Sequence, residues 1–243
     1  MPTVTRSGRS DRTYRAVIRT ALGLFRVLDF RIDLTGAHHI PATGGAVVAA
    51  NHVSYFDFML VGYAAHPHRL VRFMAKKQVF DHKVSGPLMR GMHHIPVDRS
   101  AGASAYAAAV RALRDGELVG VFPEATISEA FTPIPMKSGA ARMAIDSGAP
   151  IVPVVTWGAH RLWTKGRKPR LQRHVPVSIH VGEPLVPHPG ESAPDLTARL
   201  AETLTRMVDE VQRAYPDRPA PGQEWWLPAH LGGTAPTLAD LAR

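Results

Sequence analysis

Short apolar runs alternate along the chain with longer stretches in which apolar residues recur at helical spacing. The runs predict strands over Arg31–Thr35, Ala46–Ala50, Leu70–Ala75, Leu118–Phe122, Ile151–Thr156 and Val177–Val181. The stretches between them predict helices over Phe56–Ala65, Gln78–Gly91, Ala101–Arg114 and Lys137–Ser147. Several runs, such as AVVAA, are apolar at every position, which is typical of strands covered on both faces. We therefore expect an α/β fold with a mixed, largely parallel central sheet flanked by helices.

The first part of the chain, residues 1–30, reads as a basic tail followed by an amphipathic helix over Arg12–Phe30. Apolar side chains recur there at helical spacing, and arginines occupy the positions between them. Such a helix fits a membrane interface, and it equally fits a first helix packed on the core. Both interpretations stay open at this point.

A second amphipathic helix is predicted near the other end of the chain. Its apolar positions include Leu196, Leu200, Leu204, Met207 and Val211. It follows the capping-type sequence SAPD and ends at Tyr215 and Pro216. Residues 216–243 are rich in Pro and Gly and predict an extended tail held in place by two tryptophans. We therefore expect a central domain over residues 31–215, between the N-terminal segment 1–30 and the tail 216–243.

Charge narrows the set of partners. The formal net charge is +9, an excess that favours nucleic acid, anionic lipid or phosphorylated small molecules. No zinc-finger spacing and no basic motif with interleaved aromatic residues accompanies the excess, so we expect no nucleic-acid partner. A membrane surface and an anionic substrate are the better interpretations.

Two further absences in the sequence bear on location and chemistry. No apolar run reaches the roughly eighteen residues of a membrane span, and the polar, basic start does not resemble a secretory signal. We expect a cytoplasmic protein that contacts the anionic inner face of the plasma membrane from its periphery. The chain has no cysteine, which excludes a disulfide framework, a thiolate metal site and a cysteine nucleophile.

The segment AVVAANHVSYFD ends an apolar strand with His52 and reaches Asp57 five residues later. Functional sites in α/β sheets form at the carboxyl ends of strands. Positions five apart on one helix point away from each other, so His52 must precede the helix if Asp57 is to reach it. The carboxylate then fixes one imidazole nitrogen as the donor and leaves the other as a base for an alcohol. A capping histidine beside an unrelated surface aspartate is the alternative.

Other segments carry candidate binding residues. In GVFPEATIS a strand ends just before Glu124, whose carboxylate can accept hydrogen bonds from a substrate hydroxyl or from backbone amides, or lie at the start of a helix. In HHIPVDRS, Arg99 is a candidate for phosphate contact, with an ion pair to Asp98 as the alternative. The proline within IVPVVTWG predicts an edge strand or a bulge.

Taken together and in this order, NHVSYFD, IPVDRS, FPEATIS and IVPVV resemble the four sequence blocks of the glycerolipid acyltransferase family, the group containing bacterial lysophosphatidic acid acyltransferase. The histidine, four intervening residues and aspartate of the first block are intact. The resemblance extends from about Ile32 to Val181.

The resemblance implies an acyltransferase with no metal and no bound cofactor. The donor is expected to be acyl-CoA or acyl carrier protein, and the acceptor a lysophospholipid, with lysophosphatidic acid giving phosphatidic acid. It further implies that His52 is the general base and Asp57 its orienting partner. By the same resemblance, the substrate-binding residues are expected to be Glu124, Arg99, Lys137, Lys76, Thr126 and Ser128.

The third block departs from the usual Phe-Pro-Glu-Gly-Thr-Arg of the family at two positions, Ala125 and Ile127. The family arginine is associated with the phosphate of the acceptor. Its replacement by Ile127 leaves open acyl transfer to a glycolipid or other lipid alcohol. A non-catalytic lipid- or membrane-binding protein on the same fold is a separate alternative, against which the intact His52, Asp57 and Glu124 argue.

Overall fold

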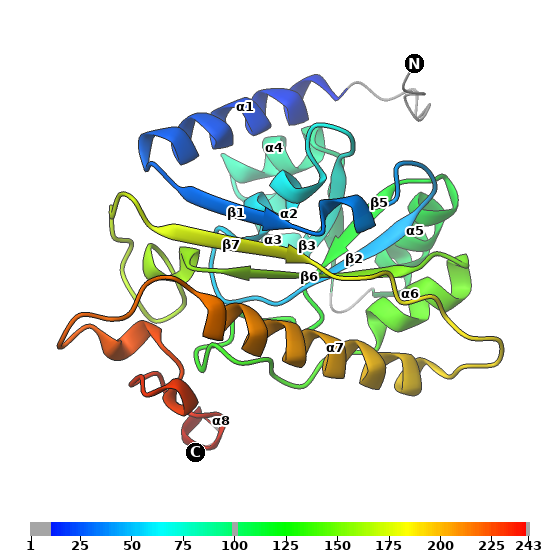
Figure 1. Cartoon of the computed structure of the whole chain (residues 1–243). Helices are drawn as coiled ribbons and strands as arrows, with labels where there is room; N and C mark the ends of the chain where they lie inside the picture. Colours follow the sequence, from blue (N-terminus) through cyan, green and yellow to red (C-terminus); the bar gives the residue numbers. More distant parts are fainter. Residues whose placement is uncertain (1–10, 99–101, 242–243) are drawn as a thin grey trace.

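The computed structural model describes residues 11–98 and 102–241. Within these residues seven strands form one sheet in the order β1-β7-β6-β2-β5-β3-β4 (Figure 1). Neighbouring strands are parallel except β6 and β7, which are antiparallel. The strands are β1 Arg31–Thr35, β2 Ala46–Ala50, β3 Val71–Lys76, β4 Ile95–Val97, β5 Leu118–Val121, β6 Ile151–Trp157 and β7 Pro176–Val181. The predicted mixed, largely parallel α/β fold is confirmed.

The helices cover both faces of this sheet. Figure 1 shows α1 and α7 on opposite sides of it. The helices are α1 Arg12–Val27, α2 Asp57–Ala65, α3 Lys77–Asp81, α4 Ser85–Gly91, α5 Gly102–Arg114, α6 Gly139–Ser147, α7 Ala193–Ala214 and α8 Leu238–Leu241.

The central strand β2 separates two apolar cores. Val47 and Ala49 belong to the core that contains residues of α5, α6 and α7, whereas Ala46, Val48 and Ala50 belong to the core beneath α1 and α2. This division follows the two-residue period of a strand, because successive side chains point to opposite faces. All five residues of β2 are buried. Packing on both faces therefore holds in place the strand that leads into the site.

The helix predicted over Gln78–Gly91 is in fact two helices, α3 and α4. The chain leaves helical geometry at His82, whose backbone is extended with φ −72° and ψ 138°. The ring nitrogen Nδ1 of His82 then accepts hydrogen bonds from the backbone amides of Val84 and Ser85, at the start of α4. A side-chain cap of this kind satisfies amides that a helix start leaves unpaired, so it favours a new helix over continuation of the old one.

Pro153 lies in β6, which is an interior strand, so the edge-strand alternative is wrong. The bulge alternative fits the pairing with β7. Val154 pairs with Val181 and Ile151 bridges Leu185, so the β7 side has one residue more than β6 between these two pairs. The missing amide of Pro153 therefore falls where the ladder is already interrupted.

The C-terminal residues do not form the predicted extended tail. They contain the short helices Glu224–Trp226, Ala229–Leu231 and α8. Trp226 is buried, and the guanidinium of Arg161 lies 4.6 Å from the centre of its ring. Arg161 also donates a hydrogen bond to the hydroxyl of Tyr215 at 3.0 Å. This part of the chain therefore packs against the residues that follow β6.

Helix α1 packs on the domain through one side. Tyr14 and Phe25 are buried, and the Tyr14 hydroxyl donates a hydrogen bond to the carbonyl oxygen of Val71 at 2.6 Å. Leu24 and Val27 are exposed on the same helix. In the part of the chain that the structure describes, no helix combines the length and the apolar character needed to cross a membrane.

Candidate active site

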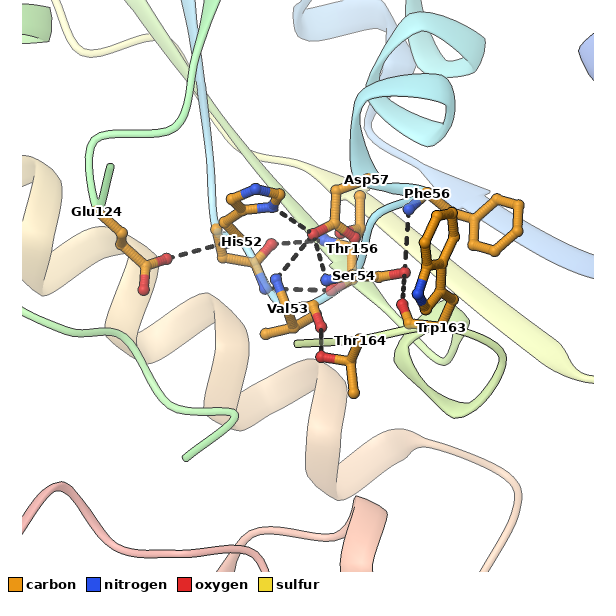
Figure 2. Close-up of polar contacts among 10 residues, drawn as sticks. His52, Val53, Ser54, Phe56, Asp57, Glu124, Thr156, Trp163 and Thr164 are labelled. Carbon is orange, nitrogen blue, oxygen red and sulfur yellow. Dashed lines mark hydrogen bonds and ion pairs between the residues drawn. The ribbon is translucent and has the colours of Figure 1, made fainter. Parts of the chain in front are cut away.

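The structure brings His52 and Asp57 together at the carboxyl end of β2. His52 lies in the loop that leaves the strand, and Asp57 is the first residue of α2. The imidazole Nδ1 lies 2.9 Å from Asp57 Oδ2 (Figure 2). The loop position of His52 is what makes this contact possible, since five residues along one helix would turn the two side chains apart.

Asp57 is buried, with 1% of its surface exposed, and both of its oxygens are occupied. Oδ2 accepts hydrogen bonds from the backbone amides of Val53 and Ser54, each at 2.7 Å, besides its contact with His52. Oδ1 accepts a hydrogen bond from Thr156 Oγ1 at 2.9 Å. An ionised carboxylate can only accept, so the proton of the imidazole lies on Nδ1.

The other ring nitrogen of His52, Nε2, is thereby left as an acceptor. Among the described residues it has no hydrogen-bond partner. About one fifth of the side chain, 21%, is exposed to solvent, so a substrate can reach it. The ring stacks on Phe122 at 4.1 Å between centres, which fixes the plane in which Nε2 points.

The segment that follows β6 holds the loop that carries His52. Thr164 Oγ1 donates a hydrogen bond to the Val53 carbonyl at 2.6 Å, and Ser54 Oγ donates one to the Trp163 carbonyl at 2.9 Å. Figure 2 shows these contacts beside the His52–Asp57 pair. Thr156 lies in β6, the parallel neighbour of β2, and Thr164 lies in the connection that follows β6. The sequence pattern singles out neither threonine, because their role depends on β6 lying next to β2 in the sheet.

Glu124 lies just after β5 and also binds the catalytic loop. Its Oε1 accepts a hydrogen bond from the His52 backbone amide at 3.0 Å, and Oε2 accepts one from the Ile134 amide at 3.2 Å. Burial raises the pKa of Glu124 to about 8, although the two amides act in the opposite direction. The sequence predicts that this carboxyl group binds a substrate hydroxyl or backbone amides, or begins a helix. The structure shows the contact with backbone amides.

The remaining predicted binding residues are placed differently from one another. Ser128 is buried; its amide donates to the His52 carbonyl at 2.8 Å and its hydroxyl to the Thr132 carbonyl. Thr126 is exposed on the turn after Glu124. Lys137 is exposed, and its amide donates to the Pro123 carbonyl.

Lys76 is exposed at the carboxyl end of β3, in front of α3. Arg99 lies outside the described residues.

The two departures in the third block also have structural counterparts. Ala125 has φ +57°, a left-handed conformation that glycine adopts without strain. The family glycine is therefore explained by the backbone, and alanine is accommodated here at some strain. Ile127 is buried, with 6% exposed, so this position presents an apolar side chain to the interior instead of a cation to a substrate.

An apolar cavity lies on the α1 side of the site. The ring of Phe122, which stacks on His52, also stacks on Phe73 at 6.1 Å. Phe73 lines the cavity together with apolar residues of α1 and α2, among them Phe25, Met59 and Gly62. Its free volume is about 40 Å³, enough for a few water-sized groups.

Comparison with known proteins identifies the family. A family model described as Acyltransferase matches residues 31–157, more than half of the chain. The chain is 30% identical over 189 residues to the 1-acyl-sn-glycerol-3-phosphate acyltransferase of Bacillus subtilis, covering 74% of this chain and 88% of that protein. It is 31% identical over 184 residues to the protein of the same name from Limnanthes douglasii, covering 74% of this chain and 61% of that protein.

A solved structure agrees with these matches. The fold is similar to that of the 1-acyl-sn-glycerophosphate (LPA) acyltransferase PlsC from Thermotoga maritima, with a TM-score of 0.72 and 25% sequence identity. The match covers 84% of this chain and 81% of that chain. The resemblance predicted from the four sequence blocks is confirmed, and the chain belongs to the acyltransferase family.

Proposed function

We propose that the protein transfers a fatty acyl group from acyl-CoA or acyl carrier protein to the hydroxyl of lysophosphatidic acid, giving phosphatidic acid. The observation that carries this proposal is the His52–Asp57 pair, in which Asp57 holds Nδ1 at 2.9 Å and leaves Nε2 open. A protein that only binds lipid does not need an imidazole nitrogen that is oriented and left open in this way. An intact base and orienting carboxylate therefore favour an enzyme over a non-catalytic relative.

In the proposed reaction His52 acts as a general base. Nε2 takes the proton of the acceptor hydroxyl while the hydroxyl oxygen attacks the thioester carbonyl. The buried carboxylate of Asp57 stabilises the imidazolium that forms, as in a triad where the substrate alcohol replaces the enzyme serine. The tetrahedral intermediate then collapses, the thiolate leaves, and the imidazolium returns the proton to it.

The cavity beside Phe73 is the proposed location of the acyl chain. It is lined by apolar side chains and is separated from His52 by the stacked rings of Phe73 and Phe122. Its free volume of about 40 Å³ is too small for a long chain. Entry of the chain therefore requires α1 and α2 to separate or their side chains to rearrange.

Ile127 affects which acceptor we propose, because the family arginine at this position is associated with the phosphate of the acceptor. Recognition of a phosphate by this chain needs a cation other than residue 127, and Lys137 and Lys76 are exposed on neighbouring segments. A glycolipid or other lipid alcohol without a phosphate next to the hydroxyl is the second candidate acceptor. The buried Ile127 is the observation that favours it.

A membrane location follows from the same proposal, because lysophosphatidic acid resides in membranes. The exposed side of α1 carries Arg12, Arg15, Arg19 and Arg26, beside the exposed Leu24 and Val27. We infer peripheral contact of this helix with the anionic inner face of the plasma membrane. A cytoplasmic protein is consistent with this inference.

The test is release of free thiol from palmitoyl-CoA in the presence of lysophosphatidic acid, compared with the His52→Ala protein. Acceptor-dependent release that disappears in the variant, with an unchanged melting temperature, is the expected result. Activity that persists in folded His52→Ala protein overturns the mechanism. Release with lipid alcohols that lack phosphate, and none with lysophosphatidic acid, replaces the first acceptor by the second.

A further inference from the structure

A second pocket lies beyond the residues that contact His52. It has a volume of about 440 Å³ and is open to solvent, a size typical of sites for small molecules. One wall is formed by Gly166, Arg167, Lys168 and Arg170 in the β6–β7 connection, and the other by Gly222, Gln223 and Trp225. These two walls are joined by a hydrogen bond from Arg170 Nη1 to Gln223 Oε1 at 3.1 Å.

The charge of this pocket is uncompensated. Among the residues that the structure describes, no acidic side chain forms an ion pair with Arg167, Lys168 or Arg170. Elsewhere on the surface arginines do face carboxylates, as in the pairs Arg199–Glu191 and Arg206–Glu210. Neighbouring like charges repel one another, so a cluster left without acids is a favourable place for an anion.

The side chains are also arranged for an anion with oxygen acceptors. The guanidinium of Arg167 lies 4.0 Å from the centre of the Trp225 ring, and that of Arg170 lies 5.9 Å from it. Stacking on an aromatic ring holds a guanidinium in place and leaves its N–H groups free to bind phosphate oxygens. The indole Nε1 of Trp225 is buried and has no partner within the described part of the chain, so this wall also contains an unsatisfied donor.

The pocket adjoins the catalytic loop through continuous chain. Trp163 and Thr164, which bind Ser54 and Val53, directly precede the basic residues. Four residues of extended chain span at most about 14 Å, so Arg167 lies within that distance of Trp163. Because β2 and β6 are parallel neighbours, their following loops leave the same edge of the sheet.

We propose that this pocket binds the phosphates at the nucleotide end of a coenzyme A thioester. The inference rests on the acyl transfer proposed above and names the donor. Coenzyme A carries its reactive sulfur at one end of a long flexible arm and an adenosine with phosphates at the other. A donor whose thioester lies at His52 therefore places its anionic end some distance away, in a pocket large enough for a nucleotide.

The acceptor is the other source of the same phosphate chemistry. The phosphate of a lysophosphatidic acid is only a few bonds from the reacting hydroxyl, so it must lie beside His52. None of the residues that line the basic pocket makes a hydrogen bond with His52. The volume of about 440 Å³ also exceeds what a glycerol phosphate fills. Both observations favour the donor.

The test compares Arg167→Glu/Lys168→Glu with a control of equal charge change, Lys83→Glu/Arg111→Glu, whose two exposed cations do not line the pocket. Calorimetry measures binding of adenosine 3′,5′-bisphosphate and, separately, of glycerol 3-phosphate. We expect the pocket variant to bind the bisphosphate about tenfold more weakly or worse, and the control to bind it like the unaltered protein. A milder variant, Arg167→Gln/Lys168→Gln, should weaken binding in the same direction and guards against misfolding.

Kinetics provide the second measurement. The KM for palmitoyl-CoA should rise about tenfold in the pocket variant, while kcat and the KM for the acceptor stay unchanged. Equal bisphosphate binding by the variant and the control overturns the proposal, as does a loss confined to glycerol 3-phosphate or to activity with acyl carrier protein. If no acceptor is acylated but bisphosphate binding is lost only in the pocket variant, the pocket stands and the proposed acceptor falls.

Discussion

At Asp57 a single carboxylate holds both the proposed base and the main chain that carries it. Its oxygens accept hydrogen bonds from His52 Nδ1, from two backbone amides of the same loop and from Thr156. His52 makes no comparable contribution to the fold through its ring, which, within the described part of the chain, has the contact with Asp57 and the stack on Phe122. The two members of the pair should therefore respond differently to substitution.

We expect Asp57→Asn to lower both activity and stability. An amide offers one acceptor where the carboxylate has two, so part of the network is lost and the imidazole no longer has a fixed tautomer. The expected effects are a fall in kcat of about 10³–10⁴-fold and a loss of about 3 kcal/mol in unfolding free energy. Chemical denaturation and thiol release measure the two quantities. His52→Ala should lose similar activity at nearly unchanged stability, and equal destabilisation by both substitutions would contradict this account.

Glu124 should make stability depend on pH. Its pKa is raised from 4.5 to about 8 in the folded protein, so between these values the folded state holds a proton that the unfolded state has released. The stabilisation is complete below about pH 4.5 and is lost as the pH rises through about 8, a change on the order of a few kcal/mol.

Chemical denaturation at about pH 5, 7 and 9, which together cover this range, measures how the free energy of unfolding depends on pH. Glu124→Gln is neutral throughout, as the protonated Glu124 is at acid pH, so its stability should change less with pH and give a flatter profile. Profiles of equal slope for the variant and the unaltered protein would show that another group is responsible.

At the scale of elements, the junction of α1 and α2 decides how much room the apolar cavity offers. Gly62 of α2 lines this cavity, and apart from its chain neighbours and the backbone of its own helix no atom lies within 4 Å of the position where a side chain would start. We expect Gly62→Leu to fill the space and to lower kcat/KM for palmitoyl-CoA about tenfold relative to octanoyl-CoA. Gly23→Leu is the matched control, because Gly23 is an exposed glycine of α1 that is likewise free of close neighbours. An unchanged chain-length preference in Gly62→Leu would place the acyl chain elsewhere.

The strands and helices differ in how well the sequence predicts them. Strands such as β2 and β6 are predictable because they are continuous apolar runs, and His52 and Asp57 are predictable as a pair because they lie within six residues of each other. Thr156 escaped detection because its contact with Asp57 spans 99 residues and depends on the order of strands, which periodicity does not encode. The break between α3 and α4 depends on the capping contacts of His82, which are equally invisible to a hydrophobic pattern.

At the scale of the whole molecule, the net charge of +9 should govern binding to membranes. We expect the protein to bind vesicles that contain anionic lipid and to dissociate as salt is raised, since each cation at such a surface contributes about 1 kcal/mol that salt screens. Arg15→Gln/Arg19→Gln on α1 should weaken co-sedimentation more than Arg206→Gln/Arg213→Gln on α7. Equal weakening by both pairs would mean that α1 is not the contacting surface.

The pairing of β1 with β7 has a consequence for the nascent chain. Arg31 is paired with Pro176, so the first strand emerges from the ribosome 145 positions before its only neighbour in the described sheet. At about 5–20 residues per second, this strand waits roughly 7–30 s before it can join the sheet. During that interval the apolar side chains of the amphipathic α1 and of β1 lack the partner strand β7, which makes this segment a natural substrate for chaperones, and a chain released before β7 is synthesised should be cleared by proteases instead of folding.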